Sequence, residues 1–214
     1  MPATEKEHPG PGHQPTTRPW RDLLQRWSDA WLDPVRHEQE RAEPFPAGIR
    51  AARWLGTTGA TPEELTGLER RLGTSLPPSY REFLGTSDGW LDTTDEIAHL
   101  LSTREIGWIK DLAPELIEGW DDGTAADHVP DEKYFVYGDE QDCYAIRTEY
   151  LGHMLKVSHT PESGDVYLLN PCVITPDGEW EAWYLAHWLP GAVRHRSFWD
   201  LMNDEYRRFH GDQD

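Results

Sequence analysis

Apolar and polar positions alternate at helical spacing in the first part of the chain. Trp20, Leu23, Leu24, Trp27 and Trp31 fall at i, i+3, i+4, i+7 and i+11, so one face of a helix over 20–31 is apolar. This Trp stripe can serve two purposes. It can pack on the rest of the fold, which the pattern favours, or it can bind a partner.

A second helix is predicted after Thr61. Thr61 is a good N-cap residue and Glu64 follows it at the spacing of a capping box. Leu65, Leu68 and Leu72 then mark an apolar face, and the glycine at 73 is suited to end the helix. The residues Leu-Pro-Pro at 76–78 break the chain, because a residue before proline is pushed to extended geometry. A short aromatic helix over 79–85 and an Asp-Gly turn at 88–89 follow.

Period-two alternation dominates the second half of the chain. Strands over 153–159 and 165–169 are predicted to form an antiparallel hairpin. We also expect a final helix that is capped by Ser197, with Asp200 three residues on. The remaining expected elements are a polar helix over 33–43, a strand or apolar loop over 97–101, a short helical turn over 102–110, a one-sided helix around 116–120, and strands over 134–137, 144–148 and 179–188.

These elements predict an α+β fold, because strand and helix do not alternate as a parallel sheet requires. We expect an antiparallel or mixed central sheet with helices packed mainly on one side. Residues 1–18 are rich in Pro, Gly and Thr and are predicted to form a disordered tail. Residues 19–47 are predicted to form a helical extension, and residues 48–214 the main domain.

Charge narrows the possible partners. The chain has 214 residues, with 39 acidic against 20 basic side chains and a net charge of −19. Such a chain repels nucleic acid and anionic membranes and attracts a basic partner. The N-terminus has no apolar signal segment and no apolar run is long enough to span a bilayer. With only two cysteines, a reducing cytoplasmic location is expected.

About half of the net charge lies between Asp111 and Asp142, a stretch that contains eleven carboxylates and one base, Lys133. This tract is either a solvated surface or a docking surface for a cationic protein. On the second reading an aromatic anchor with an acidic rim would hold an Arg- or Lys-rich partner. The residues assigned to that partner site are Trp120, Asp121, Asp122, Asp139, Glu140 and Asp142.

A search for catalytic and metal-binding patterns finds no glycine-rich phosphate loop, nucleophile elbow or paired-cysteine motif. Glu179 and Glu181 would share one strand face, either as an acid–base pair or, as the pattern favours, as a solvated face. Cys143 follows Asp142, an unfavourable setting for a nucleophile. Weaker candidates are a metal site at His153, His159 and Asp165, and an orienting role for His187 or His195. We therefore predict no catalytic, cofactor or metal site.

The stretch after Thr61 resembles the N-terminal signature of the SUKH superfamily, also called Smi/Knr-type domains. The resemblance is carried by Glu69, Leu72, Gly73, Leu76, Pro77, Tyr80, Phe83, Leu84, Asp88 and Gly89. A second match lies in the runs 168–171, 178–183 and 188–192 and in the closing helix that follows them. Together the two matches cover roughly residues 48–210.

The resemblance implies a SUKH fold and a role in binding proteins. Bacterial members of the superfamily are commonly immunity proteins that bind and neutralise toxins, often nucleases, and fungal members are regulatory scaffolds of cell-wall synthesis. Neither role requires catalysis, so the resemblance carries no catalytic residue onto this chain. Three readings follow: an immunity-type binder of a basic toxin, a regulatory scaffold without a toxin, and an uncharacterised hydrolase that uses Cys143 or the Glu179 and Glu181 pair.

Overall fold

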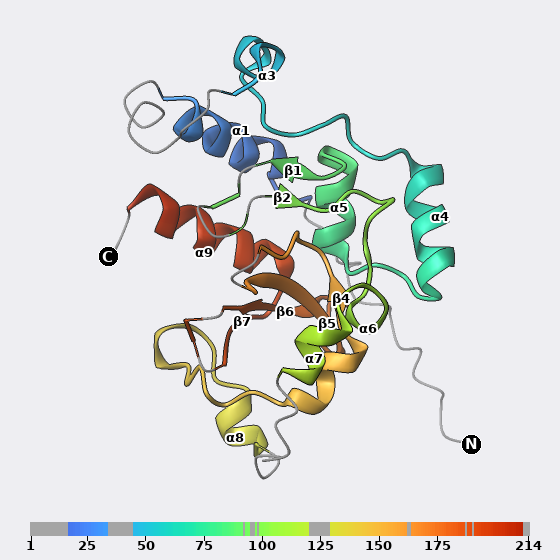
Figure 1. Ribbon diagram of the computed structural model, residues 1–214, viewed down its shortest axis with the longest axis vertical. Helices are drawn as coiled ribbons and strands as arrows, with labels where there is room; N and C mark the ends of the chain where they lie inside the picture. The colour runs from blue at the N-terminus through green and yellow to red at the C-terminus, as the bar shows by residue number, and fades with distance from the viewer. Residues whose placement is uncertain are drawn as a thin grey trace, which may run out of the picture.

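A five-stranded antiparallel sheet lies in the middle of the molecule (Figure 1). The computed structural model describes residues 17–33, 45–91, 93–94, 97, 99–119, 129–161, 164–186, 188–189 and 191–211. In spatial order the strands are β3 (Gly107–Trp108), β4 (Leu155–Lys156), β5 (Val166–Ile174), β6 (Trp180–Leu185) and β7 (Ala192–His195). Strands β1 (Trp90–Leu91) and β2 (His99–Leu100) form a second, two-stranded sheet. The α+β prediction with an antiparallel sheet is confirmed.

The long helices cover one face of the main sheet, on the upper side in Figure 1. They are α1 (Trp20–Trp31), α4 (Pro62–Leu72), α5 (Pro78–Thr86) and α9 (Phe198–His210), with the short α3 (Ala47–Ala52) beyond α1. The other face is covered by shorter pieces. These are α6 (Ile109–Leu112), α7 (Pro114–Glu118), α8 (Asp131–Tyr134) and two 3-10 turns, η1 (Gly138–Glu140) and η2 (Thr148–His153). Every residue of β6 is therefore buried.

Local sequence signals set the ends of the long helices. Thr61 caps α4 in a full capping box, since its side chain accepts from the Glu64 N–H and the Glu64 carboxylate accepts from the Thr61 N–H at 2.9 Å. Gly73 ends α4 with φ of +74°, a conformation that glycine adopts without strain. Ser197 caps α9 by accepting from the Asp200 N–H at 3.1 Å. These three predictions are confirmed.

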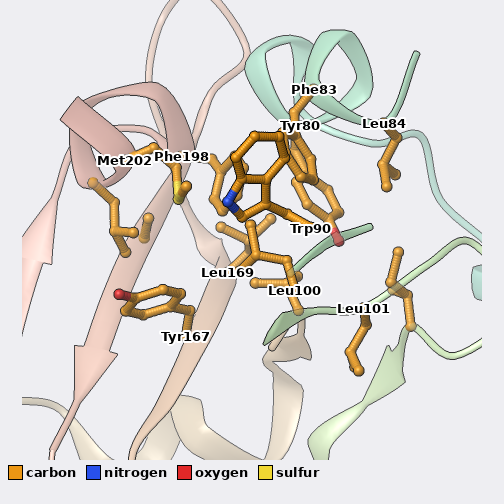
Figure 2. Packing of buried hydrophobic residues seen from close by; sticks show 14 of the residues in the cluster. Tyr80, Phe83, Leu84, Trp90, Leu100, Leu101, Tyr167, Leu169, Phe198 and Met202 are labelled. Carbon is orange, nitrogen blue, oxygen red and sulfur yellow. The ribbon is translucent and has the colours of Figure 1, made fainter. Parts of the chain in front are cut away.

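Aromatic side chains form the core beneath the long helices (Figure 2). Tyr80 and Phe83 of α5 meet Phe198 of α9, with ring centroids 4.8 and 5.2 Å from it. Trp20 of α1 joins the same group, 5.4 Å from Phe83, and the other end of α1 places Trp31 4.7 Å from Phe209. The Trp stripe of α1 is thus buried inside the fold. Such rings contribute more to stability than their area alone, because they pack edge to face.

Several predicted strands are wrong. In the run at 134–137, Tyr134 is the last residue of helix α8, which begins after Pro130, and the residues after it form no strand. Residues 144–147 form turns, with the Ile146 N–H bonded to the Tyr144 carbonyl, and Thr148 begins η2. The turn predicted over 102–110 contains strand β3 before α6. Strand β7 was not predicted at all. Residues 1–16 of the tail predicted over 1–18, and most of the polar helix predicted over 33–43, lie outside the described residues.

The hairpin of β4 and β5 is confirmed, although β4 is only two residues long. Residues 97–101, expected to form a strand or an apolar loop, contain the two-residue strand β2. Within the part of the chain that the structure describes, no helix has the length and apolar character needed to cross a bilayer. The division into a tail, a helical extension and a main domain stays a prediction.

Candidate functional site

Three of the six predicted partner-site residues lie on one exposed segment beside β7. We call residues 138–144 the acidic ribbon. Asp139, Glu140 and Asp142 are all exposed on it, and η1 forms its first turn. The other three, Trp120, Asp121 and Asp122, lie outside the described residues. The structure therefore brings together the C-terminal half of the predicted site.

The acidic ribbon is fixed to the free edge of β7. The side-chain amide of Gln141 accepts from the Arg194 N–H at 2.6 Å and donates to the Arg194 carbonyl at 2.7 Å. Two residues on, the Cys143 carbonyl accepts from the Ala192 N–H at 3.0 Å. An unpaired edge strand invites pairing with other chains, and covering it prevents this. Gln141 thus acts as a substitute for a neighbouring peptide group and holds the carboxylates on either side of it in place.

Gly191 allows the ribbon to come this close. A Cβ at position 191 would lie 1.7 Å from the Cys143 carbonyl oxygen and 3.3 Å from the Tyr144 Cα. Both neighbours are backbone atoms and cannot move aside without breaking the bond to Ala192. The glycine is therefore needed for close approach of the two chain segments.

A buried polar network lies directly under the ribbon. Its centre is the carboxylate of Glu181 on β6, which is fully buried. It accepts four hydrogen bonds from neutral donors: Tyr134 Oη (2.6 Å), Tyr137 Oη (2.8 Å), Trp183 Nε1 (2.7 Å) and Asn170 Nδ2 (3.0 Å). The guanidinium of Arg194, also buried, lies 3.3 Å from the same carboxylate. A buried charge of this kind is tolerated only when it is paired and hydrogen-bonded, as it is here.

Arg194 links the network to the ribbon. Its guanidinium donates to the Tyr134 carbonyl and, at 3.4 Å, to the Val136 carbonyl, while its own backbone holds Gln141. Burial, followed by the charge of Glu181, raises the pKa of both Tyr134 and Tyr137. Both phenols therefore stay protonated and remain donors to Glu181. The segment that leads into the ribbon is held from below by charge-assisted hydrogen bonds, which are the strong ones.

Glu179 does not share a face with Glu181, and neither is solvated, so this prediction is wrong. Glu179 lies on the helix side of the sheet, where it accepts from the Ser79 N–H at 2.8 Å and from Ser79 Oγ at 2.6 Å. It also forms an ion pair with Arg18 at 2.6 Å. Burial raises the pKa of Glu179 although these partners favour its charged form. It satisfies the first turn of α5, which Pro77 cannot cap with a side chain.

A recess of about 520 Å³ opens between the ribbon, β7 and α9. Both signs of charge line it, including Asp139, Asp204, Arg207 and Arg208. Asp204 is shared by two guanidiniums, that of Arg208 at 2.9 Å and that of Arg207 at 3.2 Å. The recess is therefore close to charge balance, whereas the ribbon beside it is acidic.

The part of the chain that contains this site matches a known protein family. The family model described as SMI1 / KNR4 family (SUKH-1) matches residues 59–204, which is more than half of the chain. The chain belongs to the SMI1/KNR4 (SUKH-1) family. No curated protein matches the chain. The match spans α4 and α5, the whole main sheet and the acidic ribbon, so the site described above is part of the SUKH-1 region.

The side chains proposed for catalysis are not arranged as a reactive pair in this SUKH-1 chain. Cys143 and His195 both line the recess, yet no hydrogen bond joins them among the described contacts. His195 Nε2 is 3.8 Å from Asp204 Oδ2, too far for a hydrogen bond. Burial lowers the pKa of His195 to about 4, so the ring is neutral at pH 7. A general base that activates a thiol must lie within hydrogen-bond reach of it.

The metal reading fails on geometry as well. His153 ends η2, β4 contains neither His153 nor His159, and the His159 ring stacks on His99 with their centroids 4.8 Å apart. Over the described residues, no three His, Cys, Asp or Glu side chains converge in a way that would hold a metal ion.

Sequence reasoning found the exposed carboxylates but missed what holds them. Gln141, Arg194 and Tyr137 carry no local signal of their role, because each acts on a residue at least 44 positions away. Glu181 was noticed only for its spacing from Glu179. Its apolar neighbours on a strand without polar alternation were the one sign that it is buried.

Proposed function

We propose that this chain is a non-catalytic protein-binding domain that binds and neutralises a basic toxin, as an immunity protein does. The observation that carries the proposal is the acidic ribbon, where three exposed carboxylates are held on the edge of β7 by Gln141. A surface that is already in its binding conformation loses little entropy when a partner docks. Membership of the SUKH-1 family supports a binding role.

Charge supports a cationic partner. The net charge of −19 produces a field that accelerates the approach of a basic protein and repels nucleic acid. Many nucleases are basic where they hold phosphate, so an acidic inhibitor that covers such a surface would block it. We propose a cytoplasmic location for the protein. We do not propose that it binds nucleic acid or a membrane directly.

The experiment is a neutralisation of the ribbon with a matched control. The partner is first captured from the native cell and purified. Its affinity is then measured for the wild type, for the ribbon variant Asp139→Asn/Glu140→Gln/Asp142→Asn, and for a control that loses the same charge elsewhere, Asp22→Asn/Glu63→Gln/Asp111→Asn. The control residues are exposed on α1, α4 and α6.

We expect a basic toxin as the partner, with an association rate that falls as salt rises. The ribbon variant should bind at least about 10-fold more weakly, and the control should stay within about 3-fold of the wild type. Equal effects of the two variants would remove the ribbon from the mechanism. A captured partner without toxic activity would instead favour the regulatory scaffold of Smi/Knr type.

A further inference from the structure

Two large aromatic side chains are exposed in the two chain segments that meet at Gly191, just before β7. Tyr144, the last residue of the ribbon, is 66% exposed, and Trp188, in the connection between β6 and β7, is 55% exposed. Among the described residues most aromatic side chains are buried or half-buried; Phe135 is exposed to 44%, and Tyr144 and Trp188 are more exposed than it. Exposed aromatic rings of this size are typical of the anchor residues in protein interfaces, where Trp, Tyr and Arg carry most of the binding energy.

The pairing of the ribbon with β7 brings the two aromatic positions to the same end of that strand. Gln141 pairs with Arg194 and Cys143 with Ala192, so the two segments run antiparallel. Tyr144 consequently lies against Gly191, with its Cα 3.3 Å from where a Cβ of that glycine would be. Trp188 is three residues before Gly191, and its ring lies 6.4 Å from that of Tyr184 at the end of β6.

A carboxylate is fixed beside the first of these rings. Asp142 Oδ1 accepts from the Tyr144 N–H at 3.0 Å, so the acidic group and the aromatic ring belong to one tight turn. The remaining oxygen of Asp142 faces no cation among the described residues. An exposed ring next to an exposed carboxylate can hold a guanidinium, which stacks on the ring and forms a hydrogen-bonded ion pair.

The molecule already uses this kind of contact between arginine and aromatic rings elsewhere. The Arg21 guanidinium lies 3.7 Å from the centroid of the Trp54 ring. Those of Arg194 and Arg147 lie 4.3 and 4.4 Å from Tyr134. Arginine prefers such sites over lysine, because its planar group stacks and is more weakly hydrated.

We propose that Tyr144, Trp188 and Asp142 form the anchor point of the partner interface and take an arginine side chain of a basic protein partner. The proposal rests on the proposed function and adds to it the residue that the partner must present. Acidic residues 139 and 140 then form the rim around the anchor, and they set the rate of association more than the affinity.

Arginine and lysine peptides of equal charge test the anchor on the full chain. The probes are acetyl-Gly-Arg-Gly-Arg-Gly-amide and its lysine counterpart, titrated into ¹⁵N-labelled protein. The readouts are the indole signal of Trp188, assigned with Trp188→Phe, and the amide signal of residue 144, which is the one followed in the double variant that lacks the indole. The variants are Tyr144→Ala/Trp188→Ala, the ribbon variant, and the control Ile174→Ala, which truncates an apolar side chain that is 57% exposed elsewhere.

We expect the arginine peptide to shift both signals and to bind about 3-fold more tightly than the lysine peptide. The aromatic double variant should abolish that preference, and Ile174→Ala should leave it intact. Equal binding of the two peptides, or an unchanged preference in the double variant, would overturn the anchor. If the anchor fails in this way but the ribbon variant binds both peptides more weakly than the wild type, the proposed function still stands. If no variant changes binding, the acidic surface is not the site and both proposals fail.

Discussion

The two faces of the central sheet are built differently. On the side of the long helices, rings such as Trp20, Phe83 and Phe198 pack against one another, and most contacts are apolar. On the other side, short helices surround a buried ion pair of Glu181 and Arg194 that is hydrogen-bonded to tyrosine and tryptophan. Apolar packing is strong but gives little orientation, whereas a satisfied polar network accepts one arrangement only.

This difference corresponds to a division of roles. The helix side supplies most of the stability, because burial of apolar area is the dominant favourable contribution to folding. The network side holds the acidic ribbon, through Tyr137 and through both the side chain and the backbone of Arg194. Changes on the first face should therefore lower stability without altering the binding surface, and changes on the second should do both.

The largest effect is expected on the helix side, for Trp27→Ala. The Trp27 ring is fully buried, with centroids 5.5 Å from Tyr206 and 6.1 Å from Phe209. Loss of the ring leaves a cavity between α1 and α9 and should lower the free energy of unfolding by about 4 kcal/mol. Urea denaturation measures it. In the folded protein, the backbone amides of Ala192 and Arg194 should still be among those that exchange slowly with solvent.

The second-largest decrease in the free energy of unfolding is expected for Glu181→Gln. The substitution keeps the shape but leaves the Arg194 charge buried without its counter-charge, which should cost about 3 kcal/mol. The double variant Glu181→Leu/Arg194→Met removes both charges and should recover part of that loss. The ribbon should exchange faster in it, because Tyr137 has lost its acceptor and the Arg194 guanidinium no longer holds the backbone that leads into the ribbon. A double variant with a rigid ribbon would show that the network is not what orients it.

The third effect depends on pH and concerns His195. Its pKa is lowered from 6.5 to about 4, mainly by burial, with Asp204 and Asp200 opposing the shift and Arg208 and Arg207 adding to it. The folded state thus binds fewer protons than the unfolded state, so this stabilisation is present above pH 6.5 and is lost as the pH falls toward 4. The loss should be on the order of 2–3 kcal/mol. Between pH 6.5 and pH 4, the free energy of unfolding of His195→Gln should therefore change less with pH than that of the wild type.

The smallest of these effects is expected for Gln141→Ala. Two backbone groups of Arg194 lose their partners but gain some access to water, so the free energy of unfolding should fall by about 1–2 kcal/mol. The Arg194 amide should exchange with solvent much faster than in the wild type. Gln141→Glu is a useful second variant, because it can still accept from the Arg194 N–H but cannot donate to the carbonyl. An unchanged Arg194 exchange rate in Gln141→Ala would show that other contacts hold the ribbon.

Sequence reasoning succeeded where a signal and its effect lie within a few residues. The capping box at Thr61, the glycine end of α4, the Ser197 cap and the apolar stripe of α1 are all of this kind. It failed where the partner is distant. Strand β7 is only four residues long and is recognised as a strand through its pairing with β6. The apolar run at 134–137 favours a strand by its composition, although its tyrosines donate to a carboxylate on β6.

The candidate site was predicted in the same uneven way. Composition alone indicated that Asp139, Glu140 and Asp142 belong to an acidic surface. It contained no information on Gln141 or Gly191, whose roles depend on the approach of two segments about fifty residues apart. Spacing wrongly assigned Glu179 and Glu181 to a solvated face, because the sequence does not show that short helices cover the second face of the sheet.

Whether the acidic ribbon is the binding surface is decided by the salt dependence of partner binding by Asp139→Asn/Glu140→Gln/Asp142→Asn. We expect this variant to unfold within about 0.5 kcal/mol of the wild type. We also expect its association rate with the purified partner to be lower and to fall less steeply between low and physiological salt. A variant whose association rate and salt dependence match those of the wild type would contradict the claim that the ribbon on β7 is the binding surface.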